Sequence, residues 1–159
     1  MPPEPIEFRI IQNLQAALQG ISVAGGYHYT VQGSAVKLDP NHKVEDLIAP
    51  DGPRPFVLIE LTPESWHYDP CSQVVLTLEP VVHWVSDATP TDDASRLQTF
   101  FRGCADVEQA IAPDTVRGGL ATDIQVVGRT FDTAVDGAQV WAQINVRIRV
   151  HRTYGQPNG

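Results

Sequence analysis

The clearest pattern in the chain is a strict alternation of apolar and polar residues near its C-terminal end. The apolar series is Val140, Ala142, Ile144, Val146, Ile148 and Val150, and the polar series between them is Trp141, Gln143, Asn145, Arg147, Arg149 and His151. Side chains along a β-strand point alternately to the two faces of a sheet. The alternation therefore predicts one long strand with an apolar face and a polar face.

Two further segments repeat apolar residues at helical spacing, and each predicts an amphipathic helix. The first covers residues 4–19 and ends at Gly20; its apolar series is Ile6, Ile10, Ile11, Leu14, Ala17, Leu18 and Ile21. The second begins near Thr91 or Asp92 and ends before Pro113, and its apolar stripe is Leu97, Phe100, Phe101, Cys104, Val107 and Ile111. Each helix has one apolar side that must be buried against another element.

Shorter apolar runs predict the other strands. Residues 56–61 form a continuous apolar run between prolines, which is typical of a buried strand. Residues 73–85 predict a longer strand, in which Pro80 indicates an edge or a bulge because proline cannot donate a ladder hydrogen bond. Residues 122–131 predict another strand, with Gly128 as a candidate bulge.

The segment that follows the first helix is expected to contain a hairpin and a loop. Residues 27–31 and 35–38 predict two short strands joined across Gly33 and Ser34. Residues 39–55 predict a proline-containing loop with room for a brief helical turn at residues 44–48.

These elements together favour an α+β fold: a single mostly antiparallel or mixed β-sheet with two main α-helices packed on one side. The strands are expected as adjacent antiparallel pairs, with a helix before each group. A length of 159 residues fits one domain over residues 1–159. Within it, residues 1–5 are expected to be an irregular arm and residues 153–159 a C-terminal tail.

Charge and hydropathy narrow the classes of partner. The formal net charge is -8, and a net-acidic surface repels phosphate, which argues against sequence-independent binding of nucleic acid. A wall of like charge would still let DNA slide through a channel without sticking. We find no apolar run long enough to span a membrane and no secretory signal pattern, so we expect a soluble protein made in the cytoplasm.

Few residues suggest catalysis or metal binding. Ser22 lies in a near match to the G-x-S-x-G elbow, but a helix precedes it where that motif needs a strand. His67, Asp69 and Cys71 alternate as ligands on a strand edge would, with His83 as a candidate fourth group. Pro70 lies between them, and Trp66 and Tyr68 are typical packing residues, so a structural role is the simpler interpretation.

Neither the cysteines nor the glycine pair is expected to do chemistry. Cys71 and Cys104 form no C-x-x-C pair, and Cys104 lies on a helix stripe, where it fills the core. Gly118 and Gly119 match no phosphate-binding motif and are expected to turn the chain from helix to strand.

The polar face of the last strand carries a basic row, Arg147, Arg149 and His151, in a net-acidic chain. It is either a solvated sheet face or, together with Trp141, a contact surface for acidic groups on a neighbouring copy. The candidate acidic partners precede the second helix; they are Asp87, Asp92 and Asp93. Both interpretations stay open from the sequence.

The order and spacing of these segments resemble the tail terminator proteins of long-tailed, lambda-like bacteriophages. In the C-terminal half the similarity rests on Ala-Asp-Val-Glu-Gln-Ala at 105–110 and Asp-Thr-Val-Arg-Gly-Gly-Leu-Ala at 114–121, followed by a strand, a turn and the alternating strand up to Tyr154. In the N-terminal half it rests on the opening helix, the hairpin after Gly26 and Tyr27, and the strand at 56–61.

The resemblance implies a virion structural protein rather than an enzyme, with no catalytic residues and no cofactor. Such subunits form a ring, usually a hexamer, that caps the tail tube at the tail-neck junction, ends its polymerisation and offers a surface to the head connector. The implied partners are further copies of the chain, the major tail tube protein and neck proteins, with DNA passing through the lumen without specific binding. A long strand with an exposed edge would suit pairing between copies.

Three alternatives remain from the sequence. One is another neck or tail component, such as a head-tail joining protein or the tube subunit itself. The others are a small hydrolase or metal-dependent enzyme, and a regulatory module that binds a host protein.

Overall fold

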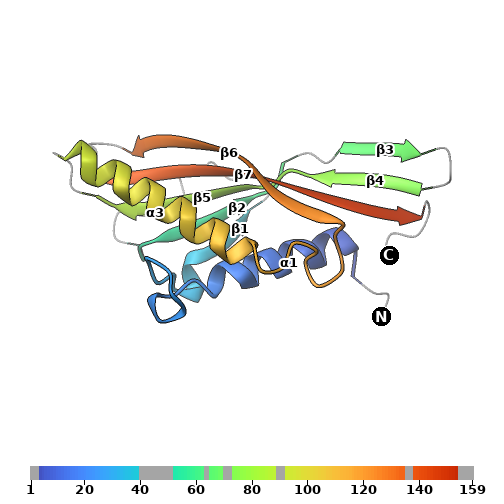
Figure 1. The fold of residues 1–159 in the computed structure, drawn as a ribbon, viewed down its shortest axis with the longest axis horizontal. Helices are drawn as coiled ribbons and strands as arrows, with labels where there is room; N and C mark the ends of the chain where they lie inside the picture. Colours follow the sequence, from blue (N-terminus) through green and yellow to red (C-terminus); the bar gives the residue numbers. More distant parts are fainter. Residues whose placement is uncertain are drawn as a thin grey trace.

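In the residues that the structure describes, the protein is a mixed β-sheet with two α-helices packed against one face (Figure 1). The computed structural model describes residues 4–39, 52–62, 65–69, 73–88, 92–134 and 138–153. The helices are α1 (Ile6–Gln19) and α3 (Asp93–Ile111), and the strands are β1 (Val36–Asp39), β2 (Phe56–Glu60), β3 (Ser65–Asp69), β4 (Gln73–Leu78), β5 (Val81–Asp87), β6 (Asp123–Ala134) and β7 (Gln139–Thr153). The predicted fold class, including both helices on one side, is confirmed.

Strand β7 is the axis of the sheet. β6 pairs antiparallel along one edge of β7, from Asp123 opposite Arg149 to Ala134 opposite Gln139. On the other edge, β5 pairs with the first half of β7 and β4 with the second half. β2 and then β1 extend the sheet from β5, while β3 extends it from β4. The β3–β4 pair and the end of β7 reach beyond the helices (Figure 1).

The predicted strand at residues 73–85 is in fact two strands, β4 and β5, which lie end to end along β7. The break falls at Glu79 and Pro80. Pro80 has no N–H to donate, but its carbonyl oxygen accepts a hydrogen bond from the Val146 amide at 3.0 Å. The strand is therefore interrupted at Glu79 and Pro80, while the chain remains hydrogen-bonded to the same edge of β7.

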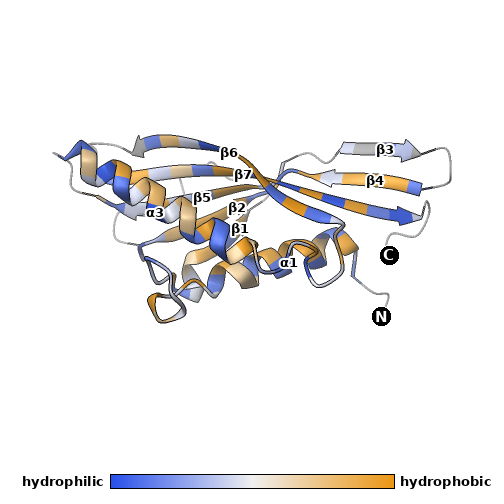
Figure 2. Ribbon diagram, viewed as in Figure 1, coloured by the Kyte–Doolittle hydropathy of each residue, from blue (hydrophilic) through white to orange (hydrophobic). Residues whose placement is uncertain are grey.

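Alternation along β7 is confirmed, because its side chains are in turn buried and more exposed. Figure 2 shows hydrophobic and hydrophilic residues alternating along the same strand. The expected free edge of this strand is wrong, since neighbours pair with both of its edges. Within the described residues, the free edge next to it belongs to β6, which pairs with β7 alone. β6 also has the expected bulge, between Val126 and Gly128.

The predicted hairpin between residues 27 and 38 is wrong. Residues 27–31 form no strand, and residues Gly33–Ala35 form a 3₁₀ turn. β1 pairs parallel with β2 instead of antiparallel with a neighbouring hairpin strand. The backbone amides of His28 and Tyr29 instead donate to the carboxylate of Asp106 on α3, which is distant in sequence, so no partner strand receives them.

Strand β3 is an addition to the sequence-based prediction, and it pairs antiparallel with β4. The predicted helical turn at residues 44–48 lies outside the described residues, as do most of the N-terminal arm and of the C-terminal tail.

The helices bury their apolar sides against the sheet. α1 buries Ile10, Leu14 and Leu18 completely, and Asp92 caps α3 by accepting hydrogen bonds from the amides of Ala94 and Ser95. Neither helix in the described part of the chain has the length and apolarity needed to cross a membrane.

The stripe of α3 differs from the prediction at two positions. Phe100, Cys104 and Val107 are buried as expected, but Leu97 is 47% exposed and Phe101 is 56% exposed. The inner side of α3 includes Gly103, which packs directly over the buried indole of Trp84. A bulky residue at position 103 would push the helix away from the sheet, so the helix is rotated to place the glycine inward.

Candidate functional site

The basic row predicted on the polar face of β7 lies on the face of the sheet that is turned away from the helices. Arg149 and His151 are exposed near the end of the strand. Arg147 is half-buried, and its Nε donates to Glu79 Oε1 at 2.8 Å. Two of the three basic groups are therefore presented to solvent at one end of the molecule.

The predicted acidic residues gather at the other end. Asp87 is the last residue of β5 and lies opposite Gln139, the first residue of β7. Its side chain is 72% exposed, with Arg54 Nε at 3.7 Å. Asp92 caps α3, and Asp93 in the first turn pairs with Arg96. We call Asp87, Asp92 and Asp93 the acidic cluster.

Strand register fixes how far apart the two charged groups are. Ten residues of β7 separate Gln139, beside Asp87, from Arg149, which corresponds to about 33 Å at the usual strand rise. The side chain of Asp87 points to the same face of the sheet as Arg149, because paired and alternate positions share a face. Within one copy the structure therefore keeps the basic row and the acidic cluster apart, at opposite ends of β7.

Trp141, the fourth residue predicted on this face, takes part in a hydrogen-bond chain. Its Nε1 donates to Nδ1 of His83 at 3.0 Å, and Nε2 of His83 lies 2.6 Å from Oε2 of Glu60. Trp141 also packs against a small apolar cluster on this face, formed by Phe56, Leu58 and Val85.

The chain Trp141–His83–Glu60 determines the protonation of the histidine. An indole N–H can only donate, so Nδ1 of His83 must be the acceptor. Nε2 of His83 then carries the hydrogen, and it donates a hydrogen bond to Oε2 of Glu60. His83 is 3% exposed, and burial lowers its pKa despite the hydrogen bond to Glu60 and the Glu60 charge, both of which raise it. The neutral imidazole joins β5 to β2 and β7.

The other residues singled out for chemistry have local structural partners. Oγ of Ser22 accepts a hydrogen bond from the Gly25 amide at 3.2 Å and caps a 3₁₀ turn, which accounts for the elbow-like sequence. His67 is exposed on β3, while the side chain of Asp69 and the whole of Cys71 lie outside the described residues. In the part of the chain that the structure describes, no three His, Cys, Asp or Glu side chains could hold a metal ion together.

Cys104 and the glycine pair match their predicted roles. Cys104 is buried in the core, and this burial raises the pKa of its thiol to about 11, which keeps the sulfur protonated. Gly118 and Gly119 adopt positive φ angles of 68° and 81°, and they turn the chain between α3 and β6.

Arg117 precedes these glycines and was not singled out from the sequence. It is 1% exposed, and its guanidinium donates to the carbonyl oxygen of Ile111 at the end of α3 and, at 3.3 Å, to Oδ1 of Asn13 on α1. A buried cation at a helix C-terminus interacts favourably with the last carbonyl groups.

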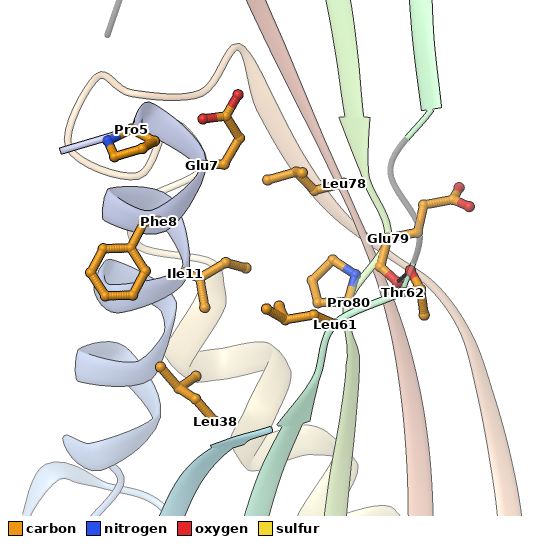
Figure 3. Close-up of a pocket in the computed structure, with 10 residues that line it drawn as sticks. All are labelled: Pro5, Glu7, Phe8, Ile11, Leu38, Leu61, Thr62, Leu78, Glu79 and Pro80. Carbon is orange, nitrogen blue, oxygen red and sulfur yellow. Dashed lines mark hydrogen bonds between the residues drawn. The ribbon is translucent and has the colours of Figure 1, made fainter. Parts of the chain in front are cut away.

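An open apolar pocket of about 540 Å³ lies between the first turns of α1 and the junction of β4 with β5 (Figure 3). We call it the α1 pocket; its lining is Pro5, Glu7, Phe8, Ile11, Leu38, Leu61, Thr62, Leu78, Glu79 and Pro80. Oγ1 of Thr62 donates to the Glu79 carbonyl at 2.6 Å and so holds the end of β2 against the strand junction. Phe8 and Leu61 remain 44% and 40% exposed, so apolar surface is left open here.

A second apolar surface lies on the outer side of α3. We call Ala94, Leu97, Phe101 and Ala105, all exposed, the α3 stripe. Phe131 of β6, 39% exposed, stacks edge-on against Phe100 beside it. The sequence-based prediction missed both the α1 pocket and the α3 stripe. The apolar pattern on the second helix did signal the α3 stripe, because with Leu97 and Phe101 it is wider than one buried side needs.

Comparisons with known proteins give likenesses among solved structures only. No family model and no curated protein matches the chain. Among solved structures, a chain described as "Virion of native gene transfer agent (GTA) particle" is similar over 90% of this chain and 92% of its own length, with 15% sequence identity and a TM-score of 0.44. At this TM-score and identity, the likeness by itself establishes neither a shared fold nor a shared function.

Proposed function

We propose that the chain is a structural subunit of a tailed-phage virion, a tail terminator that forms a closed ring on the end of the tail tube. The observation that carries the proposal is the polarity of the molecule, with exposed basic groups at one end of β7 and the acidic cluster at the other. Opposite charges at opposite ends favour contact between the basic end of one copy and the acidic end of the next. Such a heterologous contact produces a ring when the rotation closes.

Two further observations support this role. The order of elements is compatible with the small α+β subunit that the sequence resemblance implies, with both helices on one face of the sheet. The candidate nucleophiles and bases Ser22, His83 and Cys104 are each held in a structural role, as a cap, a buried hydrogen-bond bridge and a protonated core thiol. We therefore propose no catalytic step.

The ring would end polymerisation of the tube and give the head connector its attachment surface at the tail-neck junction. Its partners would be the major tail tube protein on one side and neck proteins on the other. A net charge of -8 per copy suits a lumen through which DNA passes without binding.

The decisive experiment is a phage that lacks this gene, examined by electron microscopy. We expect tails of irregular length that carry no heads, and we expect the wild-type gene supplied in trans to restore both. Tails of normal length with heads attached would contradict the proposal. Purified protein that grows into long tubes would identify a tube subunit instead of a terminator.

A further inference from the structure

The hydrogen-bond chain Trp141–His83–Glu60 fits only one protonation state of its histidine. The imidazole of His83 is buried on the sheet face turned away from the helices. Its Nδ1 accepts from Nε1 of Trp141 at 3.0 Å, and its Nε2 donates to Oε2 of Glu60 at 2.6 Å. Both ring nitrogens are in use, and both contacts are favourable only while the ring is neutral and its hydrogen is on Nε2.

A second proton on His83 finds no acceptor at Nδ1. A protonated imidazole donates from both nitrogens, and the indole N–H of Trp141 can only donate. Two N–H groups would then point at each other across 3.0 Å, so this contact changes from attractive to repulsive. Glu60 still accepts from Nε2 and now pairs with a positive charge. The Trp141 contact is therefore the one that protonation opens.

Glu60 is the charged side chain that contacts His83. Leu58 of β2 and Gln143 of β7, which lie directly opposite His83, carry no charge. Burial lowers the pKa of His83, while the hydrogen bond to Glu60 and the charge of Glu60 raise it. The ring is therefore neutral near pH 7 and takes its second proton below the usual value of about 6.5. Beyond this contact, the charged positions of this face nearest to His83 in the strand register are Lys37 and Asp39 on β1, Asp87 on β5, Asp132 on β6 and Arg147 on β7.

The indole of Trp141 can move without the strand that carries it. It is half-buried and packs against the apolar cluster of this face, which we call the outer cluster; its members are Phe56, Leu58 and Val85. The adjacent residues Val140 and Ala142 are fully buried on the helix side, and β7 is paired on both edges at this point. The backbone is therefore held in place while the side chain is able to turn about its own bonds.

We propose that Trp141 is a proton-operated cover: in acid, a proton taken from solvent by Nδ1 of His83 releases the indole, which turns its N–H to water and uncovers the outer cluster. At neutral pH the indole is held and the cluster stays covered. Val85 lies opposite Trp141 and two residues before Asp87, so the change occurs beside the acidic cluster. The inference concerns a single copy and does not depend on the proposed ring.

NMR of the ¹⁵N-labelled protein, titrated from about pH 8 to about pH 5, follows the indole N–H directly. We expect the Trp141 indole signal to shift with the same midpoint as the His83 ring. Its exchange with solvent, corrected for the intrinsic effect of pH, should become at least about tenfold faster. The internal control is Trp84, whose indole donates to Ser86 Oγ at 2.6 Å and should stay protected throughout.

The release must be local, and the backbone of β7 reports on that. Its amides should keep their protection at the pH at which the Trp141 indole loses its own. The inference is overturned if these amides lose protection together with the indole, since unfolding then accounts for the change. An indole that stays protected while His83 titrates overturns it as well. Either result leaves the tail terminator proposal in place.

Three variants separate the opposing N–H groups from simple packing. Trp141→Phe removes the indole N–H but keeps a ring at the outer cluster, so His83 should take up its proton about 0.5–1 pH unit higher than in the wild type. Glu60→Gln removes the favourable charge and should move the same titration to lower pH. Val85→Ala loosens the outer cluster but keeps the N–H, and should move it less than Trp141→Phe does. A titration in Trp141→Phe no higher than in Val85→Ala would exclude the opposed N–H groups as the cause.

Discussion

At the residue scale, the buried polar groups of this protein serve to tie elements together. Asp106 on α3 is fully buried, and its carboxylate accepts hydrogen bonds from the amides of His28 and Tyr29 and lies 2.7 Å from Nδ1 of His28. Arg117 joins the end of α3 to α1 in a similar way. Neither role follows from the sequence, because the partners of Asp106, and Asn13 as a partner of Arg117, lie far away along the chain.

We expect Asp106→Ala to lower the free energy of unfolding by about 1–3 kcal/mol, because it leaves backbone amides of the 26–30 loop without their acceptor. Urea denaturation followed by circular dichroism measures the loss. His28→Ala is the matched control, since it removes only the side-chain contact of a 46% exposed histidine and keeps both backbone bonds. Equal losses in the two variants would show that the backbone bonds contribute nothing.

The buried His83 makes stability depend on pH. Its pKa is lowered in the folded state, so the unfolded chain binds the proton more readily. The stability it contributes is complete above the unfolded pKa of about 6.5 and falls as the pH drops below that value toward the folded pKa. Protonation of Nδ1 would also break the hydrogen bond from Trp141.

We therefore expect thermal unfolding midpoints to fall as the pH is lowered below about 6.5, and His83→Gln to reduce this dependence. His151→Gln, at an exposed histidine on the same sheet face, should behave like the wild type. The same pH slope in the wild type and in His83→Gln would assign the acid sensitivity to other groups.

At the scale of elements, the sequence predicts those helices and strands in which buried positions repeat at one regular spacing. Both helices keep one buried side over three turns or more, and β7 alternates buried and more exposed residues along most of its length. Their periodicity therefore identifies them. The hairpin at residues 27–38 was wrong because a side chain on a distant helix takes the backbone donors, and no local pattern reports that. Pro80 marked an irregularity within residues 73–85, but the sequence does not show that the segment becomes two strands paired with one partner strand.

The candidate contact surfaces were predicted less fully than the elements. The basic row and the acidic cluster were identified from charge alone, but their placement at opposite ends depends on the register of β7. The α1 pocket combines residues from α1, β1, the segment just after β2, β4 and the strand junction, which only the tertiary structure brings together.

The close packing of α3 on the sheet gives a prediction at this scale. A Cβ at Gly103 would lie 2.5 Å from Nε1 of Trp84, which is buried and donates to Ser86 Oγ. Gly103→Ala should therefore destabilise the fold by about 1–3 kcal/mol, although alanine is the better helix former. Gly33→Ala, where a Cβ meets nothing within 4 Å, should change stability by less than about 1 kcal/mol. Urea denaturation of both variants measures the difference, and a stabilised Gly103→Ala would show that the helix has room to move.

At the scale of the whole molecule, the two ends of the long axis differ in their exposed charged residues and in their apolar surfaces. The acidic cluster and the α3 stripe lie at one end, and the exposed basic groups and the α1 pocket lie toward the other. Opposite charges at opposite ends favour contact between unlike ends of two copies, because two like ends repel each other.

Charge reversal tests this polarity. We expect Arg149→Glu to weaken self-association by about tenfold, and the wild-type contact to weaken with added salt, since both groups are exposed. The double variant Arg149→Glu/Asp87→Arg restores opposite charges across the contact and should recover part of the loss. Sedimentation velocity measures the association, and a double variant no better than either single one would argue against contact between these two residues.

The central position of β7 has a consequence for how the protein is made. The strand is synthesised after both helices and every other strand described, yet β4, β5 and β6 all pair with it. While it is still inside the ribosome, the earlier strands have unpaired edges, and contacts between residues distant in sequence must form late. We expect nascent chains to collapse into the native sheet only after this segment emerges, so a fragment truncated at residue 138 should remain sensitive to proteases and depend on chaperones.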